Sequence, residues 1–261
     1  MSDPNIDEAL AVPFMRRSML PSKMPIPPGS TMILGFPDVG LVGVIAASHL
    51  IDELKLVEVA YVDSELLPPL IVLHDGMPHS SMRIFAERNI VLVISETPIP
   101  AEIIYPITNA LVDWGKKKSV KMMISLSGLP IQERQDAQQL KVFTAASTQE
   151  MIKLAEAKGV EIMREGFMVG PQAVMLQRCS HIGMPAMTLL AQCFYNYPDP
   201  EAAAAVLNEL AKITGTRVDV AKLIEKGEEI RLRARDMMKR TQQELASTKK
   251  GQEYDIPVYV S

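Results

Sequence analysis

Three glycines and one aspartate between two apolar runs are the first residues whose types and spacing could do chemistry. In MILGFPDVGLVGVIAASHLI, Gly35, Gly40 and Gly43 follow a G-x4-G-x2-G pattern around Asp38. A strand, a glycine turn and a helix form the cradle that many proteins use to hold a phosphate group. This spacing matches neither the dinucleotide fingerprint nor the P-loop, because no Gly-Lys-Ser/Thr follows it.

Asp38 argues against an anion in this turn. Two like unit charges about 4 Å apart repel by about 4 kcal/mol at an effective dielectric constant near 20. A helix N-terminus offsets only about 0.3–1 kcal/mol of this repulsion, and no Lys or Arg stands nearby in the sequence. We therefore expect Asp38 to cap the helix that follows. We expect Gly35, Gly40 and Gly43 to form a packing or oligomer loop, because the next helix is apolar nearly all round and must be covered on both sides.

The other residues that could carry chemistry are dispersed. His74 and His79 bracket a DGMP turn, and their spacing is too loose for a zinc site. His181 lies in CSHIGMP, but neighbours in sequence do not define a Cys–His catalytic pair. Glu96 and Glu102 flank TPIPA just after a predicted strand, where ligand sites of open sheets often lie. Two carboxylates alone are weak support for catalysis, so we predict no catalytic residues, no metal site and no cofactor.

Composition narrows the class of protein. The net charge of −4 over 261 residues gives no electrostatic reason to expect a nucleic acid or an anionic membrane as partner. Cys179 and Cys193 form no disulfide framework and suit a reducing compartment. The acidic start MSDPNIDEAL does not resemble a signal peptide, and no apolar stretch approaches the roughly 18 residues of a membrane helix. We expect a cytoplasmic protein with no membrane partner.

Short β-branched runs alternate with helical patterns from Thr31 onward, which predicts an α/β fold whose mixed sheet carries helices on both faces. The closely spaced strands between 56 and 95 have no helix among them, so part of the sheet should be antiparallel. The predicted strands are 32–35, 56–62, 70–73, 82–87, 90–95, 120–126 and 141–144. The predicted helices are 41–54, 101–117, 147–158, 171–179 and 201–214.

One helix has clear end signals. In YPDPEAAAAVLNELAKITG, Asp199 can accept hydrogen bonds from the first free N–H groups, and Pro200 suits the first helical position. Gly215 stands where a left-handed C-cap is needed. We predict a helix between these residues.

The chain divides into four predicted regions. Residues 1–29 form a Pro-rich leader that wraps the surface or stays partly disordered, and 30–217 form the α/β domain. Residues 218–250 form a C-terminal helical region, and 251–261 form a flexible tail. The helix expected from about Asp219 packs a thin stripe either on the body or on a second subunit, and the stripe has coiled-coil spacing. Its members are Val220, Leu223, Gly227, Ile230, Ala234, Met237 and Thr241.

The C-terminal stretch STKKGQEYDIPVYVS carries the most specific signal. A Lys-Lys-Gly break precedes the apolar residues Ile256, Val258, Tyr259 and Val260, and Pro257 among them favours an extended chain. Two interpretations remain open. The segment is a peptide ligand for a partner's pocket, or it is a strand packed against its own domain.

Several stretches together resemble a known family. They are GFPDVGLVGVIAASHLI, DSELLPPLIVLHDG, ISETPIP, EGFMVGPQAVML and GMPAMTLLAQCFYNYPDPEAAAAVLNELAKITGTRVDV. Over about residues 30 to 240 the chain is similar to the proteasome assembly chaperone 2 (PAC2) family in its archaeal form. The resemblance implies a fold similar to the purine nucleoside phosphorylases without catalytic residues, homo-oligomers, and binding to proteasome α subunits.

The resemblance also bears on the tail. Some members end in a hydrophobic–Tyr–any tripeptide, whose terminal carboxylate pairs with a lysine between α subunits. Val258, Tyr259 and Val260 resemble that tripeptide, but Ser261 follows and displaces the carboxylate by one residue.

The leading hypothesis is a non-catalytic, homo-oligomeric chaperone or adaptor that binds proteasome α subunits through the tail. The alternative is a nucleoside or small-metabolite binding protein or enzyme on a phosphorylase-like sheet, using the loop 35–43, Glu96 and His181. A structural oligomer with an unrelated partner is the third possibility, because family membership does not fix the partner.

Overall fold

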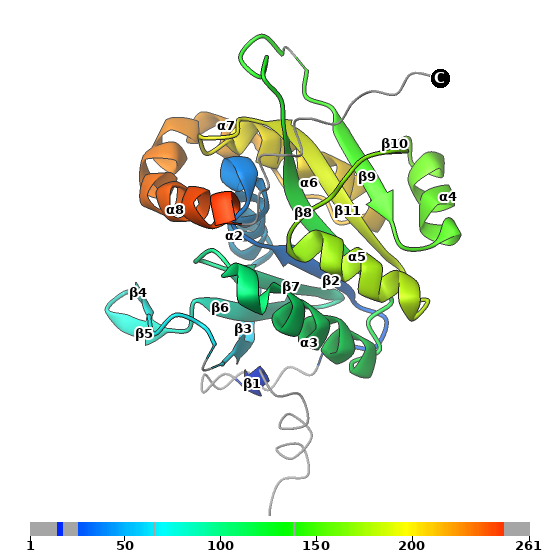
Figure 1. The fold of residues 1–261 in the computed structure, drawn as a ribbon, viewed down its shortest axis with the longest axis horizontal. Helices are drawn as coiled ribbons and strands as arrows, with labels where there is room; N and C mark the ends of the chain where they lie inside the picture. The colour runs from blue at the N-terminus through cyan, green and yellow to red at the C-terminus, as the bar shows by residue number, and fades with distance from the viewer. Residues whose placement is uncertain (1–14, 18–25, 65, 138, 248–261) are drawn as a thin grey trace, which may run out of the picture.

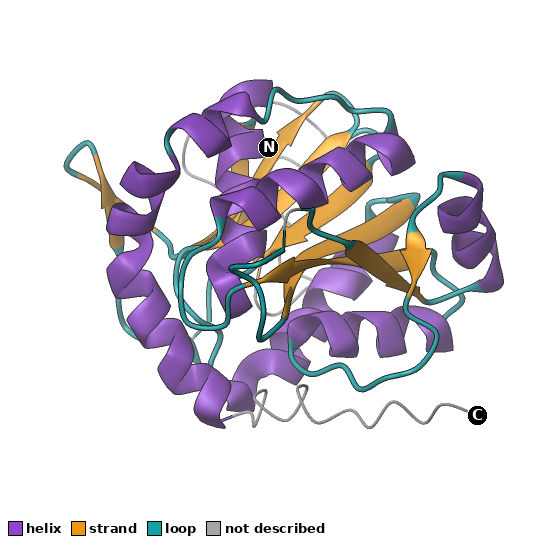
Figure 2. Ribbon diagram, turned by 90° about the horizontal axis from the view of Figure 1, so that it is seen from above, coloured by secondary structure: helices purple, strands orange, loops and turns teal. Residues whose placement is uncertain are grey.

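The computed structural model describes residues 15–17, 26–64, 66–137 and 139–247. Within these residues, a nine-stranded mixed sheet lies between two layers of helices, as predicted (Figure 1, Figure 2). The strand order is β1-β3-β6-β7-β2-β8-β11-β9-β10. The strands of this sheet are β1 (Met15–Arg17), β2 (Thr31–Gly35), β3 (Val57–Val62), β6 (Met82–Glu87), β7 (Ile90–Ser95), β8 (Met122–Pro130), β9 (Val142–Ala146), β10 (Glu161–Ile162) and β11 (Ala186–Cys193).

The helices cover the sheet on both faces. One face packs against α2 and α6, and the other packs against α3 and α5, while α4 lies beside β9 and β10. The C-terminal helices α7 and α8 pack on α6, and α8 also contacts η1. The helices are α2 (Val42–Leu54), α3 (Ile104–Lys117), α4 (Gln149–Ala157), α5 (Pro171–His181), α6 (Pro200–Thr214), α7 (Ala221–Glu225) and α8 (Gly227–Ser247), with 3-10 turns η1 (Val39–Leu41) and η2 (Ala101–Ile103).

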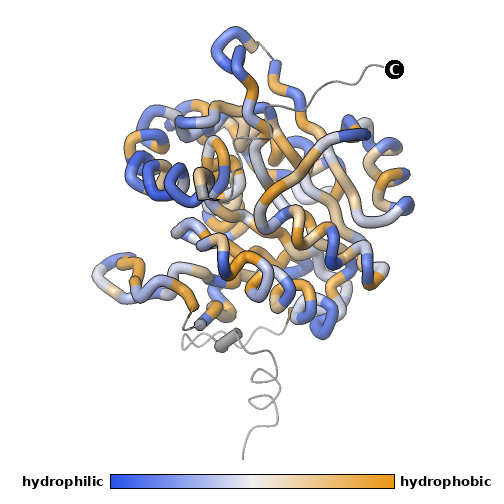
Figure 3. The backbone as a smooth tube through the Cα atoms, viewed as in Figure 1, coloured by the Kyte–Doolittle hydropathy of each residue, from blue (hydrophilic) through white to orange (hydrophobic). Residues whose placement is uncertain are grey.

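The alternation of side chains in β2 explains the two layers. Ile33 packs into the cluster around α2 and α6, whereas Met32 and Leu34 pack into the cluster around α3 and α5. All three side chains are fully buried. A strand that is apolar on both faces must be covered on both sides, which is typical of parallel strands within a sheet. Figure 3 shows the resulting concentration of hydrophobic residues on the central strands.

Four neighbouring strands run parallel. β2 is parallel to β7 and β8, and β8 is parallel to β11. β3, β6 and β7 pair antiparallel, as the closely spaced strands predicted. The loops that follow β2, β7, β8 and β11 therefore leave from one edge of the sheet, which we call the carboxyl edge. It comprises residues 36–41, 96–103, 131–137 and 194–199.

A hairpin stands away from the body. β4 (Val72–His74) and β5 (Met77–His79) form a separate two-stranded sheet, which we call the hairpin arm (Figure 1). Asp75 and Gly76 form its two-residue turn with φ values of 50° and 78°. Two positive φ values in succession match the right-handed twist of a tight hairpin, which explains the Asp-Gly pair.

The end signals of α6 are confirmed. The carboxylate of Asp199 accepts a hydrogen bond of 3.1 Å from the backbone N–H of Ala202, and Pro200 begins the helix. Gly215 ends it with a φ of 77°. Capping signals were enough to predict the ends of this helix, because Asp199, Pro200 and Gly215 all lie within one turn of those ends.

Four strands, β1, β5, β10 and β11, were not among the predicted strands. β11 has the sequence AMTLLAQC and was absent from the predicted strands. Its alanines, leucines, methionine and glutamine favour a helix locally, but β8 and β9 pair with it on both sides. β1 lies inside the leader, where the prolines had suggested no regular structure, and it pairs antiparallel with β3.

The C-terminal stripe packs on the body. Leu223 and Thr241 are buried, and Ile230, Ala234 and Met237 contact the cluster around α2 and α6. The structure thus supports the first of the two alternatives for this stripe. The helix does not run unbroken from Asp219, because a turn at Lys226 separates α7 from α8.

Two contacts attach the C-terminal helices to α2. His49 Nε2 lies 2.6 Å from the carbonyl oxygen of Asp219, and Lys222 Nζ lies 2.5 Å from Glu53 Oε1. The hydrogen bond with Lys222 lowers the pKa of Glu53, and the same bond raises the pKa of Lys222. None of the described helices combines the length and hydrophobicity that a membrane crossing requires.

Candidate functional site

The glycine loop after β2 is packed against backbone. A Cβ atom added to Gly43 would lie 2.3 Å from the carbonyl oxygen of Leu126, and one added to Gly35 would lie 2.3 Å from Cβ of Ala47. Gly40 has a φ of 63°, which favours glycine. In this structure the three glycines allow η1 and α2 to lie directly against β2 and β8.

Asp38 does not cap the helix, so this prediction was wrong. Its carboxylate makes no capping hydrogen bond to η1, and the N-cap position of α2 is Leu41. Asp38 is 6% exposed and accepts hydrogen bonds from Ser127 Oγ and, at 3.1 Å, from Gln172 Nε2. These donors lie 89 and 134 residues away in sequence, so no local pattern indicated them. Asp38 thereby connects the loop after β2 to β8 and α5.

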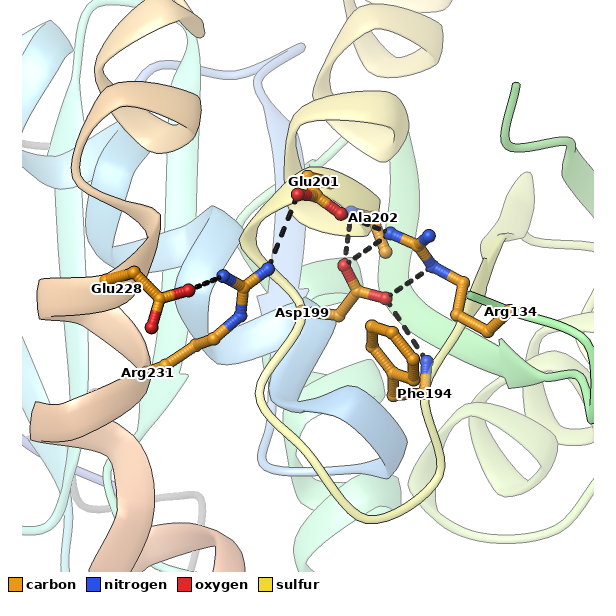
Figure 4. Close-up of polar contacts among 7 residues, drawn as sticks. All are labelled: Arg134, Phe194, Asp199, Glu201, Ala202, Glu228 and Arg231. Carbon is orange, nitrogen blue, oxygen red and sulfur yellow. Dashed lines mark hydrogen bonds and ion pairs between the residues drawn. The ribbon is translucent and has the colours of Figure 1, made fainter. Parts of the chain in front are cut away.

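A second buried carboxylate organises the neighbouring loops (Figure 4). Arg134 Nε and Nη2 lie 2.8 and 3.0 Å from the two carboxylate oxygens of Asp199. The backbone N–H of Phe194 donates to Asp199 at 3.1 Å, in addition to the capping bond from Ala202. The Arg134 guanidinium also lies 4.8 Å from the centre of the Phe194 ring. Asp199, with no exposed surface, is therefore fully supplied with donors.

Glu201 extends this cluster to the C-terminal helix. Its carboxylate lies 2.6 Å from Arg134 Nη2 and 3.4 Å from Arg231 Nη2, and Arg231 also contacts Glu228 (Figure 4). Burial opposes the charge of Arg134 and acts to lower its pKa, but the hydrogen bonds and charges of Asp199 and Glu201 outweigh this and raise the pKa. The loops after β8 and β11 are thus fixed to each other and to α8.

Three exposed aromatic side chains stand on three different segments of the chain. Tyr197, in the loop after β11, is 66% exposed and packs edge-to-face on Phe194. Tyr105, in the first turn of α3, is 60% exposed, and Phe167, in the loop before α5, is 73% exposed. Exposed aromatic residues on a rigid scaffold are enriched among the residues that dominate protein–protein binding energy. Tyr197 therefore presents an exposed aromatic ring on a loop that the Arg134–Asp199 ion pair holds in place.

A separate ionic cluster holds the base of the hairpin arm. Arg83 contacts Glu96 at 2.9 Å and Glu58 at 3.4 Å. His74 lies 3.0 Å from Glu96, and His79 lies 3.3 Å from Glu58. The two histidines bracket the turn as predicted, and the carboxylates beside them are already bound to arginine. In the part of the chain that the structure describes, no three His, Cys, Asp or Glu side chains gather to hold a metal ion.

The comparison with known proteins decides the family. Residues 32–238 match the family model of the PAC2 family. The chain belongs to the PAC2 family. The crystal structure of Pyrococcus furiosus PbaA, described as an archaeal homolog of proteasome-assembly chaperone, has a TM-score of 0.80 and 30% sequence identity to this chain, over 88% of this chain and 98% of PbaA.

Other relatives support the same fold. Pyrococcus furiosus PbaB, described as an archaeal proteasome activator, has a TM-score of 0.71 at 22% identity, over 85% of this chain and 98% of PbaB. A Methanocaldococcus jannaschii protein described as uncharacterized is 27% identical over 248 residues, which cover 95% of this chain and 98% of that protein.

The structure of this chain brings together only two of the three parts of the alternative metabolite site, the loop 35–43 and Glu96. Glu96 follows β7 at the same edge as the glycine loop, because Ile94 pairs with Gly35. His181 ends α5, whereas Gln172 near its start reaches Asp38. Nine residues of helix separate His181 from Gln172 by about 14 Å. The loop, Glu96 and His181 therefore do not form one site, and Glu102 is exposed on η2.

The cysteine next to His181 in sequence is buried. Cys179 has no exposed surface, and burial raises the pKa of its thiol to about 12. A thiol with so high a pKa is a poor nucleophile near neutral pH, because the thiolate is the reactive form. Cys193 is likewise buried and outside any disulfide, and its side chain lies against Gly40 of the glycine loop.

The predicted tail residues and the Arg134–Asp199 pair differ from the other site residues in what the structure shows of them. Ile256, Val258, Tyr259 and Val260 lie outside the described residues. The Arg134–Asp199 pair was missed, because Asp199 gave only its local capping signal and Arg134 lies in IQERQDAQQ, which matches no motif. The Pro-Asp-Pro turn marked Asp199 in the sequence, but only the structure shows that this carboxylate is buried and therefore needs a cation.

Proposed function

We propose that this PAC2-family chain is a non-catalytic, homo-oligomeric chaperone or adaptor in the cytoplasm, and that it binds proteasome α subunits. The similarity to PbaA, at 30% identity and a TM-score of 0.80, is the observation that carries the proposal. Cys179 and Cys193 are buried and are not joined in a disulfide, which is compatible with a reducing compartment.

The proposed contact is the tail, with Ile256, Val258, Tyr259 and Val260 as its apolar residues. The position of α8 supports this assignment. Gln242 Nε2 in α8 donates to the backbone oxygen of Asn196 at 3.2 Å and to its side-chain oxygen at 3.1 Å, so the last turns of α8 lie beside the loop after β11. Fourteen residues follow Ser247, and an extended chain of that length spans at most about 48 Å.

A pull-down with purified proteasome α subunits tests both parts of the proposal. The full chain is compared with a chain that ends at Asp255 and with Tyr259→Ala, while Lys249→Ala serves as a control substitution just before the tail. We expect binding by the full chain and by Lys249→Ala, and at least tenfold weaker binding by the other two.

The outcomes separate the partner from the mechanism. Equal binding by the full and shortened chains would reject the tail and retain the α-subunit partner. Absence of binding by the full chain would reject the proposed function itself.

A further inference from the structure

A cluster of positive charges lies at the amino edge of the sheet, opposite the carboxyl edge. Arg88 lies in the turn between β6 and β7, and four lysines lie in the last turn of α3 and in the loop before β8. We call Arg88, Lys116, Lys117, Lys118 and Lys121 the basic edge. Lys118 is half-buried, and the other four side chains are exposed.

Backbone hydrogen bonds bring the two segments of the basic edge to the start of β2. The N–H of Thr31 donates to the carbonyl oxygen of Asn89 at 2.8 Å, and the N–H of Lys121 donates to the carbonyl oxygen of Ser30 at 2.9 Å. The turn after β6 and the loop before β8 therefore lie on either side of residues 30–31. The basic edge is one surface although its members come from distant parts of the chain.

Nearby negative charges do not cancel the basic edge. Asp113 on α3 is paired with Arg178 at 2.9 Å, and Glu87 at the end of β6 is half-buried. The C-terminal end of α3 supplies about half a unit of negative charge, against five cationic side chains. A helix end favours lysines in its own last turn, but Arg88 and Lys121 lie outside any helix. The positive charge of this edge therefore exceeds what the end of α3 accounts for.

The carboxyl edge has the opposite sign. Each charged residue that is exposed in its loops is acidic, whereas the guanidinium of Arg134 is buried against Asp199. We call the exposed residues Glu102, Glu133 and Asp136 the acidic edge. In Figure 1 the loop after β8 projects at the top of the molecule, and α3 ends at the lower right. The two charged surfaces thus lie at opposite ends of the parallel strands.

We propose that the basic edge of one copy of this chain docks on the acidic edge of a second copy, so that the copies associate head to tail. Charge complementarity selects this arrangement, because a twofold contact through either edge would place charges of the same sign against each other. A head-to-tail contact is heterologous and produces a closed ring or an open filament. The inference rests on the homo-oligomer of the proposed function and identifies its subunit contact.

Reversal of the basic edge tests this contact in the full chain. One variant combines Lys116→Glu, Lys118→Glu and Lys121→Glu. Analytical ultracentrifugation over a series of concentrations should show association at least about tenfold weaker than that of the parent, because like charges then face each other. A matched control changes three exposed lysines outside the basic edge, Lys153→Glu, Lys158→Glu and Lys239→Glu. It has the same net charge as the first variant and should associate as the parent does.

Restored complementarity is the decisive measurement. Reversal of the acidic edge by Glu102→Lys, Glu133→Lys and Asp136→Lys should weaken association as much as reversal of the basic edge. A chain that carries both sets of changes should return to within about threefold of the parent, because its two edges again have opposite signs. A variant that had merely lost its fold would not be restored by three further substitutions.

The outcomes separate this contact from the proposed function. An oligomeric parent whose association is unchanged in both reversed variants would overturn the head-to-tail contact and leave the homo-oligomer in place. Equal weakening by the control variant, or no recovery in the chain with both sets of changes, would also overturn it. A monomeric parent would reject the homo-oligomer itself, and the contact with it.

Discussion

At Gly43, the backbone of a neighbouring strand decides what a substitution costs. The Cβ atom of Gly43→Ala would lie 2.3 Å from the carbonyl oxygen of Leu126 and 2.9 Å from that of Phe36. Backbone cannot move aside as a flexible side chain can, so α2 would have to shift away from β8. We expect the free energy of unfolding to fall by about 1–3 kcal/mol, the usual cost of overpacking.

Gly227→Ala is the matched control at the residue scale. The nearest atom to its added Cβ is Arg231 Nη1 at 3.6 Å, an ordinary contact. Because alanine favours a helix over glycine, this variant should gain up to about 1 kcal/mol. Urea unfolding measures the expected loss of stability in Gly43→Ala and the expected gain in Gly227→Ala. A Gly43→Ala protein as stable as the parent would contradict the packing role of Gly43.

The Arg134–Asp199 pair gives the second prediction at this scale. Arg134→Met removes the guanidinium and leaves the Asp199 carboxylate with no exposed surface and no cation. Breaking one partner out of a buried ion pair costs about 3–5 kcal/mol, and we expect a loss of that size in denaturant unfolding. Glu201→Gln is the comparison, because its side chain is 45% exposed. Glu201→Gln should lower the free energy of unfolding by less than about 1 kcal/mol. Equal losses in Arg134→Met and Glu201→Gln would contradict the importance of the buried Asp199 carboxylate.

At the scale of elements, the pair between Lys222 and Glu53 attaches α7 to α2 and makes this attachment depend on pH. The lowered pKa of Glu53 means that its contribution is present above the ordinary value of 4.5 and is lost as pH falls through the value in the folded protein. The raised pKa of Lys222 means that its contribution is full below 10.5 and is lost as pH rises through the folded value.

Lys222→Met should therefore lower the thermal midpoint most between about pH 5 and pH 10, the interval in which both groups are charged in the unfolded as well as the folded protein. The difference from the parent should shrink at both extremes and in high salt, because the pair is at the surface. Thermal melts across pH measure this difference. A constant offset at every pH would indicate that Lys222 acts through packing of its methylene groups instead.

At the scale of the whole molecule, we expect a homo-oligomer whose assembly is independent of the tail. The core, the carboxyl edge and the packed C-terminal helices all lie within the described residues up to Ser247. A chain that ends at Asp255 should therefore have the same oligomeric mass by light scattering as the full chain. A monomeric full chain would reject the predicted oligomer, and a loss of assembly on shortening would move the subunit contact to the tail.

Local signals in the sequence predicted the parts of the fold whose partners are also local. The ends of α6 are set by Asp199, Pro200 and Gly215, all within one turn of the helix that they bound. The apolar runs of β6 and β7 and the short gap between them were enough to predict an antiparallel pair. Family motifs spread along the chain added the PAC2 assignment, which the family model confirms over residues 32–238.

Tertiary structure alone decided the features whose partners lie far along the chain. β11 is a strand because β8 and β9 flank it, against the helical preference of its own residues. Asp38 turns from a predicted helix cap into a buried acceptor because Ser127 and Gln172 come to it from β8 and α5. Arg134 and Asp199 meet across 65 residues. Local propensities are worth a few tenths of a kcal/mol per residue, so strand pairing and the need to satisfy a buried charge override them.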